Sequence, residues 1–329
     1  MSIETIIFLC LFNCLFVFYF DFISLKLNIY SKTIYKKKEI KKKVPLTGGI
    51  FLLLNFNILV FFSNNTLSFP YESNILIILM LSNFLFIIGF LDDKINLNPY
   101  WKLLLFTIFS LFILNYYNFL SIYELRFSFT GKVLELGQYS FFFTLFAIFV
   151  FINALNMFDG INGHTGIYTS FVMGAFFILS NKLIFLYFLI LILIFLYLNL
   201  KNKFFIGNSG TFFLGMFISS ISIFFYNEGI IKFSDDIFLI MFLPGVDLIR
   251  LFFLRIINKK NPFSRDHNHW HHIISHTFGN NLTLLVTGTL CSFPFMLSAF
   301  SALTNFYIII ISCLFYLLTI YFCKKNINF

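Results

Sequence analysis

Long apolar runs, separated by short polar segments, dominate the pattern of this chain. Most runs are close to the length of about 20 residues at which a helix crosses a bilayer. They lack the strict alternation of a barrel strand, so helices are the only spanning structure that fits them. The pattern therefore predicts an all-α, polytopic integral membrane protein with eleven transmembrane helices. The expected spans are residues 4–24, 46–62, 74–91, 100–117, 139–156, 165–180, 183–200, 211–226, 237–254, 282–302 and 304–323.

The distribution of lysine and arginine predicts how these spans are oriented. Eight lysines lie between residues 26 and 43, directly after the first run. If that loop is cytosolic and the spans alternate, most other basic residues also fall on the cytosolic side, which is the usual bias. We therefore expect an outside N-terminus and a cytosolic C-terminus. The outer side receives only Arg126, Lys132, Lys182 and Lys232.

The composition supports a membrane protein and narrows its class. Hydrophobic residues make up 59% of the chain, aromatic residues 22% and charged residues 11%. The net charge of +9 follows from the topology and favours anionic lipid headgroups over nucleic acid. The five cysteines lie within or at the end of apolar runs and form no CxxC pair, so we expect neither disulfides nor a zinc site. Without an internal repeat or soluble domain, residues 1–329 are expected to form one transmembrane domain.

The adjacent carboxylates of Asp92 and Asp93 lie where the run 74–91 ends. Two acidic groups at membrane depth are costly unless something pairs with them. A hard divalent cation such as Mg2+ suits them, because it takes oxygen ligands and retains waters and substrate phosphates in its shell. The alternative interpretation is a charged stop signal at a helix end.

Two further clusters interrupt the apolar pattern on the same side. Residues 43–49 combine Lys43 with a proline and two glycines, which indicates a turn with close backbone approach or a plain re-entry turn. Residues 153–164 are rich in asparagine and contain Asp159, a density of amides that favours binding of a polar ligand. Within this segment, His164 is expected to be a polar loop residue.

Three more clusters follow. Small residues at 205–211 open a span and predict backbone N–H groups for a phosphate, or an N-cap by Ser209. Asp247 and Arg250 lie three apart and either pair with each other or mark a site within a span. Residues 262–272 are rich in histidine, and with oxygen donors nearby and no cysteine we expect phosphate contacts there, not zinc.

All six clusters fall on the expected cytosolic side, and none falls on the outer loops 63–73, 117–138 or 227–236. This one-sided placement predicts a cytosol-facing site assembled from several span ends. A transporter, the alternative class, would place polar groups near the bilayer midplane and often shows repeat symmetry.

Taken in order, the clusters resemble the polyprenyl-phosphate N-acetylhexosamine-1-phosphate transferase family. The resemblance covers about residues 40–275 and is carried by Asp92-Asp93, the Asp-Gly-Ile-Asn-Gly segment at 159–163 and the His-x-His-His loop at 269–272. That loop is more similar to the N-acetylglucosamine-1-phosphate transferases than to the translocase that makes lipid I. Eleven spans also fit the former branch.

The resemblance implies a reaction at the bacterial cytoplasmic membrane. A cytosolic UDP-N-acetylhexosamine, such as UDP-N-acetylglucosamine, would give its sugar-1-phosphate to undecaprenyl phosphate and release UMP. This is the first membrane step of a cell-surface polysaccharide, such as the O-antigen of lipopolysaccharide or a cell-wall polymer. The expected cofactor is Mg2+, with Mn2+ as the second choice, and the family is compatible with a homodimer.

The resemblance also implies roles for individual residues. Asp92, Asp93 and Asp159 are the expected catalytic residues, and Asp92, Asp93 and Asn208 are the expected metal ligands. The lysines before residue 43 would attract anionic lipid. The expected substrate-binding residues are Lys43, Asn156, Asn162, Asp247, Arg265, His269, His271 and His272.

Asn208 departs from the family pattern, which has a metal-binding aspartate at this position. An asparagine carbonyl can bind Mg2+ but brings no charge, so metal binding should be weaker. Either the remaining carboxylates suffice, or the chain is a non-catalytic relative that binds nucleotide-sugar or prenyl phosphate.

Overall fold

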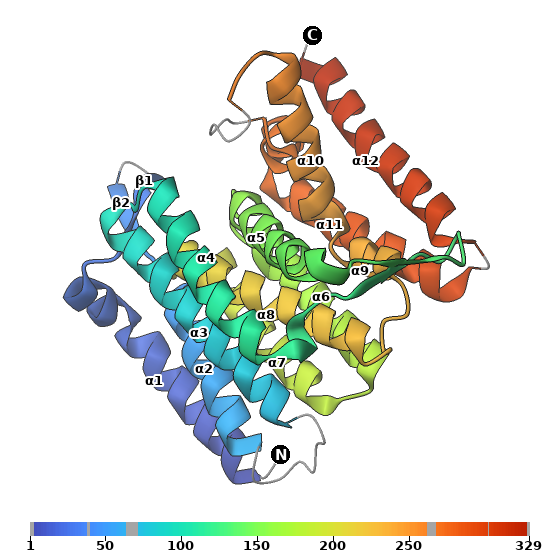
Figure 1. The fold of residues 1–329 in the computed structure, drawn as a ribbon. Coiled ribbons are helices and arrows are strands. Elements are labelled where there is room, and N and C mark those ends of the chain that lie inside the picture. The colour runs from blue at the N-terminus through green and yellow to red at the C-terminus, as the bar shows by residue number, and fades with distance from the viewer. Residues whose placement is uncertain (1–2, 38–39, 64–71, 262–267, 302, 328–329) are drawn as a thin grey trace.

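The structure of the protein is a computed structural model that describes residues 3–37, 40–63, 72–261, 268–301 and 303–327. α-Helices occupy every apolar run that the sequence predicts (Figure 1). Two short 3-10 helices also occur, at Asn118–Leu120 and Gly137–Tyr139. The α-helices are α1 (Ile3–Leu27), α2 (Gly48–Ser63), α3 (Glu72–Ile95), α4 (Pro99–Tyr116), α5 (Ser140–Phe158), α6 (His164–Ser180), α7 (Leu183–Leu200), α8 (Gly207–Asn227), α9 (Ser234–Ile240), α10 (Phe242–Ile257), α11 (Trp270–Phe300) and α12 (Asn305–Ile327).

The prediction of an all-α membrane protein is confirmed at this level. Among the described residues, seven helices are long and apolar enough to cross a membrane, and α9 with α10 would make an eighth. The apolar helices α2 and α6 are shorter. The count of eleven crossings and the orientation of the termini stay predictions.

Helix α8 lies at the centre of the bundle (Figure 1). All of its residues from Ser209 to Tyr226 are buried, and it packs against α2, α3 and α5. It is the least apolar of the seven long spans, because its surface faces protein side chains and not lipid. The core around it is largely phenylalanine, with Phe56, Phe188 and Phe217 in mutual ring contact.

The predicted continuous span 237–254 is wrong, because the chain bends by 88° between α9 and α10. Proline lacks an N–H group, and its ring clashes with the carbonyl four residues earlier. Pro244 therefore disfavours continuation of the helix through Ile240, which is where α9 ends. The predicted span 282–302 is also too short. Helix α11 begins at Trp270, and Gly279, with φ 79°, interrupts it.

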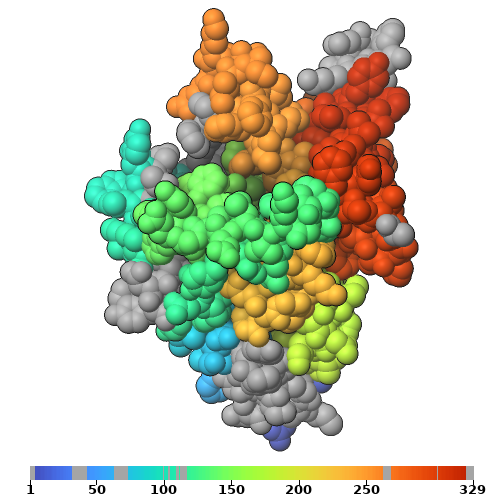
Figure 2. All heavy atoms as spheres, turned by 45° about the vertical axis from the view of Figure 1, so that its right-hand side comes forward, coloured from blue at the N-terminus to red at the C-terminus, as the bar shows by residue number. Residues whose placement is uncertain are grey.

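Two antiparallel hairpins occupy segments that the sequence analysis treated as loops. Strand β1 (Tyr30–Lys37) pairs with β2 (Ile40–Pro45), and β3 (Glu124–Arg126) pairs with β4 (Val133–Glu135). The β3–β4 hairpin extends to α12, as Figure 2 shows, where Phe129 contacts Phe306. A search for apolar runs misses both hairpins, because the first contains many lysines and the second contains polar residues.

Arg126 and Asp235 anchor the second hairpin. The Arg126 side chain lies over the ring of Tyr226, 4.3 Å from its centroid, and donates to the Tyr226 carbonyl at 2.8 Å. Asp235, in α9, accepts hydrogen bonds from the backbone and the hydroxyl of Ser128. These contacts join the end of α8 to the start of α9.

Candidate functional site

The start of α8 is capped by a carboxylate from another helix. Asp93, near the end of α3, accepts hydrogen bonds from the backbone N–H of Asn208 at 2.8 Å and of Ser209 at 2.9 Å. A carboxylate at this position is favourable because the helix N-terminus carries unpaired N–H groups and partial positive charge. Asp93 therefore fixes the end of α3 to the start of α8.

This cap bears on both interpretations of residues 205–211. The N–H groups of Asn208 and Ser209 donate to Asp93, and the expected N-cap by Ser209 is wrong, because the helix has no side-chain cap. Gly207 makes the contact possible. Its φ is +70°, and a Cβ at this position would lie 2.6 Å from Oδ2 of Asp93, so a side chain there would be strained and would also displace the carboxylate.

Asp92 is buried and lies between two donors. The ammonium group of Lys102, in α4, is 2.5 Å from its Oδ2. The side-chain amide of Asn208 donates to the same oxygen at 2.8 Å. Asn208 thus acts here as a neutral partner of a carboxylate, at a position where an aspartate would place two negative charges side by side.

The end of α5 joins the same assembly. The hydroxyl of Thr211, in the first turn of α8, donates to Oδ1 of Asn156 at 2.8 Å. Asp159 follows the last residue of α5 and accepts a hydrogen bond from Thr165 at 2.8 Å. Burial raises the pKa of Asp159 to about 7, against the opposing effect of that hydrogen bond and with a further contribution from the charge of Asp93.

The segment after α5 lies directly against the histidines at the start of α11. A Cβ added to Gly160 would lie 1.8 Å from Nε2 of His271, so only glycine allows this approach. The ring of His271 lies 5.5 Å from that of His269 and 4.3 Å from that of His272. The expected clusters at 153–164 and 262–272 therefore meet at Gly160.

Asp247 is the centre of a hydrogen-bond network that joins α10, α11 and α12. Its Oδ1 accepts from Arg250 at 2.7 Å and from the hydroxyl of Tyr316 at 2.7 Å. Its Oδ2 lies 3.0 Å from Nδ1 of His269, and the backbone N–H of Trp270 donates to Oδ1 at 3.1 Å. The predicted pairing of Asp247 with Arg250 is confirmed. Because the carboxylate accepts, Nδ1 of His269 carries the hydrogen.

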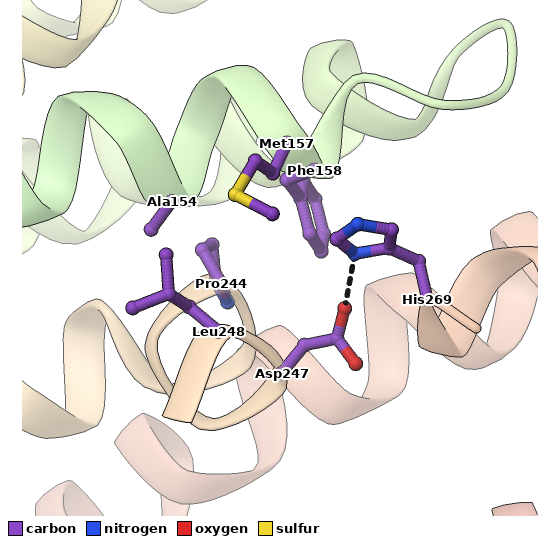
Figure 3. Close-up of a pocket in the computed structure, with 7 residues that line it drawn as sticks. All are labelled: Ala154, Met157, Phe158, Pro244, Asp247, Leu248 and His269. Carbon is purple, nitrogen blue, oxygen red and sulfur yellow. Dashed lines mark hydrogen bonds and ion pairs between the residues drawn. The ribbon is translucent and has the colours of Figure 1, made fainter. Parts of the chain in front are cut away.

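A small pocket lies beside this network (Figure 3). Asp247 and His269 form its polar side, and the rest of its lining is mainly apolar. It lies between α5 and α10, which also pack against each other, so the polar groups of two clusters face an apolar pocket. The pocket is lined by Ala154, Met157, Phe158, Pro244, Asp247, Leu248 and His269.

The contacts link all six predicted clusters into one continuous assembly. The cluster at 43–49 reaches α8 because the N–H groups of Gly48 and Gly49 donate to the carbonyls of Phe205 and Ile206, at 2.9 and 3.0 Å. Asp93 joins the acidic pair to α8, and Asn156 joins the segment 153–164 to it. His271 joins the histidine-rich segment to Gly160, and Asp247 is joined to that segment through His269.

Three predicted residues lie away from these contacts or outside the description. Lys43 is exposed in β2, where it pairs with Ile34, and Arg265 lies outside the described residues. The side chain of Asn162 donates to Asn202 in the turn before α8. Within the described ranges, no group of three acidic, histidine or cysteine side chains is close enough to hold a metal ion alone.

Several residues in the assembly were not predicted. They are Lys102, Thr165, Thr211 and Tyr316. Tyr316 lies in α12, beyond the predicted core of 40–275. The ten-residue separation of Lys102 from Asp92 across the Asn98-Pro99 turn is a local signal that could have been used.

Comparison with known sequences finds a matching family model. The sequence model described as glycosyl transferase family 4 matches residues 75–226, a range that contains the acidic pair, the asparagine-rich segment and the start of α8. Over this range the chain is similar to that family. The similarity confirms the resemblance to the polyprenyl-phosphate N-acetylhexosamine-1-phosphate transferases.

Curated relatives extend the family match toward both ends of the chain. The undecaprenyl-phosphate alpha-N-acetylglucosaminyl 1-phosphate transferase of Thermotoga maritima is 29% identical over 277 residues, which cover 83% of this chain and 81% of the relative. The protein of the same name from Escherichia coli K12 is 26% identical over 281 residues, 80% of this chain and 74% of the relative. That of Salmonella typhi is 25% identical over 286 residues, 83% and 76% respectively.

Proposed function

We propose that this protein transfers N-acetylhexosamine-1-phosphate from a UDP-sugar to undecaprenyl phosphate and releases UMP. The observation that carries the proposal is the continuous assembly of six polar clusters around the start of α8. The names of the relatives support the sugar-phosphate and the prenyl acceptor. The reaction would begin synthesis of a cell-surface polysaccharide.

The proposed arrangement in the cell follows from the topology expected from the sequence. The protein is a multi-pass membrane protein, and we place it in the bacterial cytoplasmic membrane with the site on the cytosolic face. The chain would act as one transmembrane catalytic domain. The core from about 40 to 275 is supplemented by α12, because Tyr316 binds Asp247.

The residues of the assembly suit phosphoryl transfer by positioning and charge stabilisation. The ammonium group of Lys102 pairs with Asp92 and holds that carboxylate in place. His271 provides ring nitrogens beside Gly160, and Asp247 orients the ring of His269. Asp159, with a pKa of about 7, can exchange a proton at neutral pH.

The donor chemistry fits Mg2+, with Mn2+ as the alternative ion. Asp92, Asp93 and Asp159 provide carboxylate oxygens, and when all three are ionised two negative charges remain after Lys102 has paired with Asp92. Asn208 donates through its amide nitrogen, which leaves its carbonyl oxygen as a potential ligand. When bound, the ion would neutralise the diphosphate and the departing UMP. Substrate phosphates and water would complete its shell, as is usual for Mg2+.

A second candidate function rests on the Asn208–Asp92 hydrogen bond. This contact gives Asp92 a neutral donor without a metal ion, as expected in a relative that binds nucleotide-sugar or prenyl phosphate but does not turn it over.

The deciding experiment is release of UMP by purified protein supplied with undecaprenyl phosphate, Mg2+ and a series of UDP-N-acetylhexosamines. We expect turnover with at least one sugar. No turnover with any sugar would refute the enzyme, and turnover that appears only in Asn208→Asp would establish the non-catalytic relative.

Asp93→Asn tests the site itself. We expect it to abolish turnover while the protein still inserts into the membrane. Asp236→Asn is the matched control, because Asp236 also accepts a backbone N–H at a helix start, from Phe233 at 3.1 Å. It lies beyond the other end of α8, about 30 Å away by helix rise, and should leave turnover intact. Full activity of Asp93→Asn would contradict the site assignment.

A further inference from the structure

His164 is a buried histidine to which the proposed reaction gives no role. It begins α6, directly after the 159–163 turn, and its side chain has 0% exposure. The expectation of a polar loop residue is therefore wrong. Its ring stacks on Phe158 with a centroid distance of 3.7 Å and lies parallel to that of Trp270 at 6.0 Å. His164 thus packs between the end of α5 and the start of α11.

The hydrogen bonds of His164 define its tautomer. Its Nδ1 lies 2.7 Å from the carbonyl oxygen of Phe158. A carbonyl only accepts, so Nδ1 carries the hydrogen and Nε2 presents a lone pair. That Nε2 atom is buried and has no hydrogen-bond partner among the described residues. An acceptor without a donor is rare in a protein interior and calls for an explanation.

The ring of His271 lies next to that of His164. The two ring centroids are 4.8 Å apart, and both nitrogens of His271 are buried and unpartnered within the described part of the chain. One of them, Nε2, lies over Gly160, beside Asp159. The other charged or titratable groups near His271 are His269, His272 and Asp247.

We propose that His164 is a positioning residue that acts through His271, an inference that rests on the proposed function. Phosphate oxygens only accept hydrogen bonds, so a diphosphate is bound best by an imidazolium, which has two N–H donors. The diphosphate takes one donor of His271, and Nε2 of His164 takes the other. The neutral acceptor thereby fixes the ring orientation and stabilises the form that binds phosphate.

Three substitutions separate this role from simple packing. His164→Leu removes both nitrogens and should lower kcat/KM for the UDP-sugar about 10- to 100-fold, since it leaves a buried donor of His271 unsatisfied. His164→Gln replaces Nε2 with a group that can accept and should restore most of the loss. His164→Asn retains a donor to the Phe158 carbonyl but lacks an atom at the Nε2 position. If Asn restores activity as well as Gln, His164 only anchors the turn and the proposal is wrong.

A double-mutant cycle tests whether His164 acts through His271. In the His271→Ala background, His164→Leu should lower kcat/KM less than twofold, because the N–H donor of His271 that binds His164 is already absent. Equal losses in both backgrounds would overturn the proposal. Tyr168→Phe is the matched control. Tyr168 is a fully buried residue of the same helix whose hydroxyl also lacks a partner among the described residues, and its substitution should leave kcat/KM unchanged.

A binding measurement keeps this inference distinct from the proposed function. The thermal shift produced by UDP-N-acetylglucosamine in detergent does not require turnover. We expect His164→Leu to raise the apparent Kd for this probe about tenfold or more, and His164→Gln to raise it less. Wild-type protein that binds the probe but releases no UMP would refute only the reaction. An unchanged Kd in His164→Leu would refute only the role of His164.

Discussion

Replacing Asn208 by aspartate would convert a neutral contact at the acidic pair into a repulsive one. The amide nitrogen of Asn208 lies 2.8 Å from Oδ2 of Asp92. Two carboxylates at that distance repel each other by about 6 kcal/mol at an effective dielectric constant of about 20, and by about 4 kcal/mol once they have moved to about 4 Å. Lys102 already balances Asp92 and cannot balance a second charge. Asn208→Asp should therefore destabilise the metal-free protein by about 4 kcal/mol.

Thermal unfolding in detergent, with EDTA or with Mg2+, measures this effect. For a chain of this size about 4 kcal/mol corresponds to about 6 °C in Tm. We expect Asn208→Asp to unfold about 6 °C below wild type in EDTA and to recover with Mg2+, because an ion that binds only the folded state stabilises it. Mg2+ should raise the Tm of the wild type by a smaller amount.

The reciprocal exchange Asp92→Asn with Asn208→Asp is the control. It moves the single charge to the other side of the hydrogen bond, away from Lys102, and avoids two adjacent carboxylates, so it should unfold at a higher temperature than Asn208→Asp in EDTA. If Asn208→Asp itself matches wild type in EDTA and shows no response to Mg2+, the contact between Asp92 and Asn208 does not exist in solution.

Three other substitutions test the surrounding network. Lys102→Met should lower the free energy of unfolding by about 3 kcal/mol, since it leaves the buried carboxylate of Asp92 without its ion pair. Lys102→Arg should retain most of that free energy. Equal melting temperatures for the two variants would contradict the ion pair. Asp247→Asn should cost about 3 kcal/mol in the same assay because Asp247 pairs with Arg250, and a loss below about 0.5 kcal/mol would refute the network. Asp235→Asn should weaken the contact to Ser128 by about 1 kcal/mol and speed proteolysis of the β3–β4 hairpin. UMP release should not change. Loss of turnover would show that the hairpin acts on the site.

The apolar pattern predicted the helices because burial in lipid demands long apolar segments. It failed where a single residue overrides the pattern. Pro244 breaks the otherwise continuous apolar run 237–254. Gly279 interrupts α11, which begins at Trp270, well before the apolar run 282–302. The β1–β2 hairpin was missed for a related reason. Its lysines read as a charged loop, although its backbone pairs as two strands.

The polar clusters were found from the sequence, but their partners were not. Asp93 was recognised as one of an acidic pair, yet the N–H groups that it binds lie 115 and 116 residues away. No spacing rule reports such a distance. The fate of His164 shows the same limit, because a histidine after two glycines resembles a loop residue until the packing of Phe158 and Trp270 against it is known.

The enclosure of α8 also bears on how the protein is made. Its neighbours α2, α3 and α5 all precede it in the chain, so they leave the ribosome first and can enter the membrane before α8 is complete. Helix α8 would then insert between helices that are already in the membrane. Its modest hydropathy is sufficient for insertion because it contacts neighbouring helices and not lipid. A nascent chain ending before Gly207 would lack this central helix and leave the carboxylate of Asp93 without the backbone groups that it binds. Completion of α8 is thus the step of biogenesis at which the candidate site first takes shape.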